Sequence, residues 1–122
     1  MAFTLSPKSE GFYYTISVPY INDRGVSQVD KFEMKFKRIS RSQLNELQKA
    51  QERISESDVQ GDSLERDVDY VMEIAEGWRH IDGEPDFTRE NVYTMLDKYA
   101  NAASAIVAAF FEATLGGGKR KN

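Results

Sequence analysis

The chain has 122 residues, 40% hydrophobic and 30% charged, a composition typical of one soluble globular domain rather than of a disordered segment. Its formal net charge of −4 argues against a general nucleic-acid binder, because contacts to phosphates need a basic face. The absence of cysteine excludes disulfides, thiolate catalysis and cysteine-based zinc sites, and it fits a reducing cytoplasm.

The first third of the chain has the alternation of β-strands, which we predict near residues 11–20 and 27–38. Apolar residues at every second position give each strand one apolar face: Tyr14, Ile16 and Val18 on the first, and Phe32, Met34 and Phe36 on the second. A turn around Gly25 connects them, because glycine adopts a positive φ readily. The result is a hairpin of two strands, or of three if Phe3 and Leu5 add a short one.

The apolar spacing then changes to that of helices. Ser40 and Gln43 have the spacing of a capping box at the start of a polar helix over about 41–55. A loop over 56–62 follows, and a second helix with a buried stripe is expected over about 63–77.

Turn residues interrupt the helical pattern over 78–86, where an Asp-Gly pair and a proline occur. Thr88 is placed to cap a third helix. Phe87 and Val92 flank this cap at the spacing of a hydrophobic staple, which strengthens the predicted helix start.

An alanine-rich last helix over about 100–115 is apolar nearly all round. It is too short for a membrane span and is interrupted by Ser104. Such a helix either lies in the centre of a small domain or joins subunits. It is separate from the third helix, or the two form one bent helix over 89–115.

These patterns predict an α+β fold, with an N-terminal β-hairpin followed by three to four helices. We expect a single domain over 1–115, made of a hairpin part over 1–39 and a helical part over 40–115. The Gly-rich basic residues 116–122 are expected to form a flexible tail.

Candidate chemistry is sparse. His80, the only histidine, lies near Asp82, Glu84 and Asp86, but these residues occur in a Gly/Pro turn without the spacing of a calcium loop. One histidine without cysteine is also a poor ligand set for a transition metal, so we expect solvated turn residues and no metal site. No motif of a nucleophile elbow, phosphate loop or zinc protease occurs, so no catalytic residue, cofactor or enzymatic activity is predicted.

Several features suggest binding instead. Trp78 either anchors an interface or closes the core beneath the turn. The row of Lys31, Lys35 and Lys37, with Arg38, could bind phosphate, although such rows are more often solvated sheet faces or protect an edge strand against aggregation. The candidate interaction surface comprises hairpin, turn and last-helix residues that are also the expected core: Phe32, Met34, Phe36, Trp78, Ile106, Phe110 and Phe111.

The order of elements over the last three quarters of the chain is informative. It runs from "FEMKFKRISRSQLNEL" through a Gly-Trp turn and "DGEPDFTREN" to an Ala-rich helix and a Gly-rich Lys-Asn terminus. This order resembles that of the tail assembly chaperones of long-tailed bacteriophages or of a prophage. Ala100 stands where many relatives have proline, which weakens the expected break between the last two helices.

The resemblance implies a non-enzymatic chaperone that binds and solubilises the phage tape measure protein during tail morphogenesis. It implies self-association into a ring or a spiral, a location in the host bacterial cytoplasm, and absence from the mature virion. We expect no nucleic-acid partner and no membrane partner. Many members are made in two lengths by a −1 frameshift, and Arg120 to Asn122 can be encoded by a slippery site. Two alternatives stay open: a minor virion structural protein of the tail or head–tail connector, and a small cytoplasmic protein-binding regulator.

Overall fold

The computed structural model describes residues 10–56 and 63–116, with side chains described over 10–50 and 63–116. The sheet is antiparallel in the order β1-β2-β3 and consists of β1 (Phe12–Ile21), β2 (Ser27–Phe36) and β3 (Ala75–Arg79). The helices are α1 (Arg41–Glu56), α2 (Ser63–Ile74), α3 (Arg89–Lys98) and α4 (Ala102–Phe111), which continues as a π-helical turn over Glu112–Gly116. The predicted α+β fold is therefore confirmed.

The N-terminal hairpin has the predicted strands and turn. Its register pairs Ile16 with Phe32 and Ile21 with Ser27, so the alternating apolar side chains of both strands share one face. At the turn the Asn22 side-chain oxygen accepts hydrogen bonds from the backbone of Arg24 at 2.9 Å and of Val26 at 3.0 Å. Gly25 has the expected positive φ, 76°.

The third strand corrects a prediction. Residues 75–79 were expected to end a helix and begin a turn, but they form β3, which pairs Met34 with Trp78. The partner strand lies about forty residues earlier in the chain, so local periodicity carries no sign of the pairing. The alternative third strand at Phe3 and Leu5, most of the loop over 56–62 and most of the 116–122 tail lie outside the described residues.

Two predicted helix starts are confirmed by hydrogen bonds. The Ser40 hydroxyl accepts from the Gln43 backbone N–H at 3.3 Å, and the Thr88 hydroxyl accepts from that of Asn91 at 3.1 Å. Tyr99 has an extended conformation, φ −119° and ψ 101°, which ends α3 before α4 begins. Residues 89–115 are therefore two helices rather than one bent helix.

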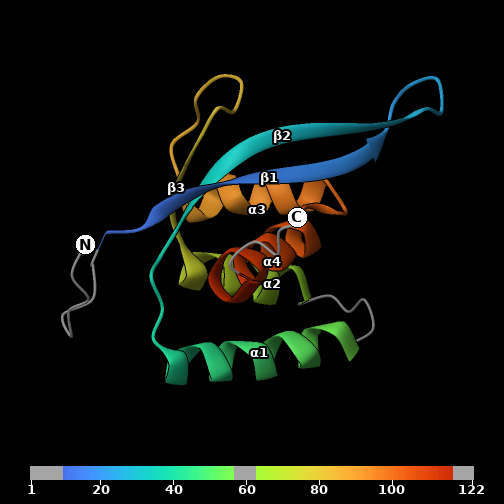
Figure 1. Ribbon diagram of the computed structural model, residues 1–122. Helices are drawn as coiled ribbons and strands as arrows, with labels where there is room; N and C mark the ends of the chain where they lie inside the picture. The colour runs from blue at the N-terminus through green and yellow to red at the C-terminus, as the bar shows by residue number, and fades with distance from the viewer. Residues whose placement is uncertain (1–9, 57–62, 117–122) are drawn as a thin grey trace.

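The strands and helices are arranged in layers (Figure 1). The sheet lies on one side, α3 and α4 pack beneath it, α2 comes next, and α1 lies farthest from the sheet. Because α4 contacts both β1 and α2, it occupies the centre of the fold, the first of the two positions expected for an apolar helix. Within the described residues, no helix is long and apolar enough to cross a membrane.

Candidate interaction surface

The seven residues of the candidate interaction surface lie mainly in the core. Met34, Phe36, Ile106 and Phe110 are 0% exposed and Phe32 is 7% exposed, whereas Trp78 and Phe111 are half-buried. Five of the seven therefore have almost no side-chain surface to offer a partner while the chain is folded. The helices of the same chain cover the apolar face of the hairpin, because a hairpin is not stable without such a cover.

Aromatic contacts connect these residues across the layers. Phe36 on β2 meets Phe110 on α4 edge-on at 5.3 Å between ring centroids, and Phe110 meets Phe111 at 5.1 Å. Trp78 on β3 meets Phe32 at 6.4 Å and Phe87 at 5.1 Å. These contacts join the sheet to the last helix and to the segment before α3.

Trp78 contributes to closing the core beneath the turn, which is one of its two expected roles. Its indole N–H donates a 2.8 Å hydrogen bond to the carbonyl oxygen of Pro85, and its ring packs on Phe87. These contacts close the loop between β3 and α3 over the core. The single tryptophan is therefore an internal anchor for that loop.

The loop after β3 carries the only histidine. His80 has a side chain 67% exposed, and its nearest charged neighbour is Glu33, with Nε2 3.9 Å from Oε1. The nearby Asp82, Glu84 and Asp86 are also exposed, as expected for solvated turn residues. Among the residues that the structure describes, no group of three or more His, Asp or Glu side chains could hold a metal ion.

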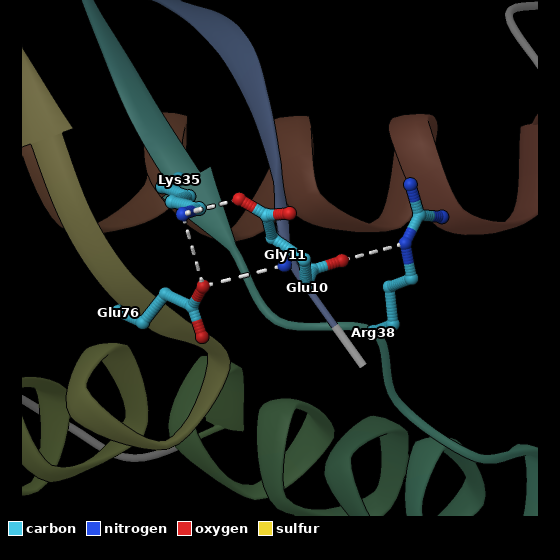
Figure 2. A network of polar contacts seen from close by, with 5 residues as sticks. All are labelled: Glu10, Gly11, Lys35, Arg38 and Glu76. Atoms are coloured by element: carbon cyan, nitrogen blue, oxygen red, sulfur yellow. Dashed lines mark hydrogen bonds and ion pairs between the residues drawn. The ribbon is translucent and has the colours of Figure 1, made fainter. Parts of the chain in front are cut away.

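Two lysines of the predicted row make contacts within the chain: Lys37 donates to the Met72 carbonyl at 3.2 Å, and Lys35 lies in a cluster of polar groups (Figure 2). The Lys35 ammonium lies 3.6 Å from the Glu10 carboxylate and 3.5 Å from that of Glu76. The Glu76 carboxylate also accepts from the Gly11 backbone N–H at 3.3 Å, and the Arg38 side chain donates to the Glu10 carbonyl at 2.8 Å. This cluster, the N-terminal clasp, holds the start of β1 against β2 and β3.

Other polar groups stabilise the helices. The buried Tyr70 hydroxyl donates a 2.6 Å hydrogen bond to the Leu47 carbonyl and so connects α2 to α1. Burial, with a smaller contribution from Glu73, raises the pKa of Tyr70 to about 12. Burial also raises the pKa of the Asp67 carboxyl, and the nearby Arg66 opposes that shift.

Arg89 connects α3 to α2. Its guanidinium lies 2.6 Å from the Asp69 carboxylate and 2.9 Å from that of Glu65. Hydrogen bonds to Asp69 and Glu65 raise the pKa of Arg89 above its ordinary value. All three side chains are exposed, so the pairs orient the helices more than they stabilise them.

Exposed apolar side chains gather at the turn end of the hairpin, which sequence reasoning missed. Ile21 is 64% exposed, Val26 52% and Val29 51%. Beside them a hollow of about 430 Å³ lies between β2, the loop after β3 and α3, and its lining includes Phe32, Ile81, Met95 and Tyr99. Strand alternation indicates only which face of a strand a side chain lies on, and the packing of the helices decides which apolar side chains stay exposed.

A family model described as phage tail assembly chaperone matches residues 1–122. Comparisons with curated proteins and with solved structures found no match. The chain belongs to the phage tail assembly chaperone family, as its order of elements indicated.

Proposed function

We propose that this chain binds the phage tape measure protein and keeps it soluble while the tail assembles. The observation that carries the proposal is the family match along all of residues 1–122, which assigns the general role in tail assembly. A long helical protein that waits for its tail tube exposes apolar helix faces, and such faces aggregate unless another protein covers them.

The contact surface is proposed at the C-terminal end of α4. Phe111 is half-buried, and Leu115, in the following π-helical turn, is 55% exposed. Two apolar side chains near one helix end can cover a short stretch of an apolar helix, whereas the buried candidates Phe110 and Ile106 support the position of α4 from within. Trp78 supports the fold in the same way through its hydrogen bond to Pro85.

Repeated weak contacts suit this task. Several copies of the chain, self-associated as a ring or a spiral, would present many such surfaces along one tape measure protein. Avidity then supplies strength without a tight single contact. The proposed role is non-enzymatic, takes place in the host cytoplasm, and leaves the chain absent from the mature virion.

Co-expression tests the proposal. The tagged chain is produced with the longest helical open reading frame downstream in its genome, and soluble recovery and co-purification are scored. We expect the long protein to be soluble only with this chain and to co-elute with it. If the long protein stays insoluble while this chain is folded, the proposal fails, and purified particles are then searched for the chain as a virion component.

A matched pair of variants tests the surface. Leu115→Asp places a charge at the exposed end of α4 and should reduce co-purification, while Asn45→Asp adds the same charge at an exposed position of α1 and should not. If both variants co-purify as well as the unmodified chain, the contact surface lies elsewhere.

A further inference from the structure

One edge of the sheet is open over half its length. β1 pairs with β2 along all ten residues, but β3 pairs only with Glu33 to Phe36. Among the described residues, no strand pairs with β2 over 27–32 on the β3 side. The Lys37 backbone N–H donates to Ile74 on that side at 2.8 Å, and alternation along a strand points the backbone groups of 27, 29 and 31 the same way.

The loop after β3 explains why this edge is open. His80 directly follows the Glu33–Arg79 pair and has a φ of 67°, a left-handed conformation that is uncommon outside glycine. Such a residue cannot continue an extended strand, so the chain turns away from β2 at this point. The hollow beside Phe32 lies where a longer β3 would have continued.

The opposite edge of the sheet is better protected. Pro19 in β1 has no N–H to offer, and its carbonyl oxygen accepts a 3.0 Å hydrogen bond from the Asn101 side chain. The β2 edge over 27–32 has no proline, and exposed Val29 lies in its middle. An added extended strand could pair with this edge, because its backbone can both donate hydrogen bonds to the edge and accept them from it.

We propose that two copies of this chain pair through this open edge of β2, antiparallel and about a two-fold axis. Charge excludes two of the possible registers. A two-fold axis at Asp30 would place two carboxylates opposite each other, and one at Lys31 would place two ammonium groups opposite each other. An axis at Val29 pairs Val29 with Val29, Gln28 with Asp30 and Ser27 with Lys31, so no like charges meet.

This register also brings the exposed apolar residues together. In this register Ser27 of the second copy pairs with Lys31 of the first. Val26 of the second copy then lies opposite Phe32 of the first, beside the hollow. By the same alternation, Val29 and Ile21 lie on the outer face of the hairpin, where they form an apolar patch across the axis. The second copy therefore supplies both a strand for the open edge and an apolar side chain for the hollow.

The interface gives a defined geometry to the self-association proposed above and rests on that part of the proposed function. A two-fold contact of this kind is isologous and closes as a dimer, so a longer ring or spiral would be built from such dimers through a different surface.

Sedimentation velocity of the full chain over a range of concentrations tests the interface. We expect a dimer, and Val29→Asp should weaken it about tenfold or more, because two carboxylates then face each other at the axis. Ser17→Asp is the matched control, because it adds the same charge to an exposed position of β1 away from the open edge, where the paired residue is Lys31 and not a carboxylate. Circular dichroism melts establish that both variants are folded.

Single cysteines test the register, because the chain has none of its own. Val29→Cys should form a disulfide-linked dimer under mild oxidation, while Lys31→Cys, expected opposite Ser27, should not. A chain that stays monomeric at every concentration overturns the interface and self-association together. A dimer that persists in Val29→Asp and does not cross-link at 29 overturns this interface alone.

Discussion

Gly11 is the position where the structure makes its sharpest prediction about stability. A Cβ atom added there would lie 2.2 Å from the Phe36 carbonyl oxygen and 2.9 Å from the Glu76 carboxylate. The carboxylate can move aside, but the carbonyl belongs to the backbone of β2, which β1 and β3 hold from both sides. Gly11→Ala must therefore displace the start of β1 from β2.

The cost can be estimated. Forcing an extra carbon into a packed site costs about 1–3 kcal/mol, and the displacement also breaks the hydrogen bond from the Gly11 N–H to Glu76. Gly77→Ala is the matched control, because a Cβ there meets only the Lys35 Cβ, at an ordinary 3.7 Å. That variant should be neutral or more stable by about 0.4–1 kcal/mol, since alanine restricts the unfolded chain.

Urea unfolding followed by far-UV circular dichroism measures the difference. We expect Gly11→Ala to be less stable than Gly77→Ala by about 1.5–4 kcal/mol, with similar denaturant slopes. If the two variants unfold at the same urea concentration, the close approach of Gly11 to Phe36 is refuted.

Three further variants test the core. Tyr70→Phe removes the bond to Leu47 and should cost about 1–3 kcal/mol in urea unfolding. The pKa of Tyr70 is near 10 in the unfolded chain and about 12 in the folded chain, so the unfolded chain loses the proton first. The free energy of unfolding should therefore fall as the pH rises from 10 to 12. Tyr70→Phe should make this fall smaller. Phe110→Asp buries a carboxylate at a fully buried position and should abolish the folded circular dichroism spectrum; a folded variant would contradict the described core. Trp78→Phe loses the bond to Pro85 and should lower the free energy of unfolding by about 0.5–1.5 kcal/mol, and unchanged stability would mean that this bond contributes little.

Much of the fold follows from local patterns. Alternation placed β1 and β2, and hydroxyl residues before apolar runs placed the starts of α1 and α3, because these signals depend on neighbours within a few residues. The apolar face with Phe32, Met34 and Phe36 was correctly predicted as core. Its proposed second use as an interaction surface was not something a pattern could decide, because an apolar face looks the same whether a helix or a partner covers it.

The sequence by itself therefore determined the class of fold, the hairpin, the helix caps and, through the order of its elements, the family. Tertiary structure alone decided that residues 75–79 form a strand, that Gly11 passes against Phe36, and that Ile21, Val26 and Val29 stay exposed beside an open edge. These features depend on contacts between residues far apart in the chain, and such contacts exist only after the layers have packed.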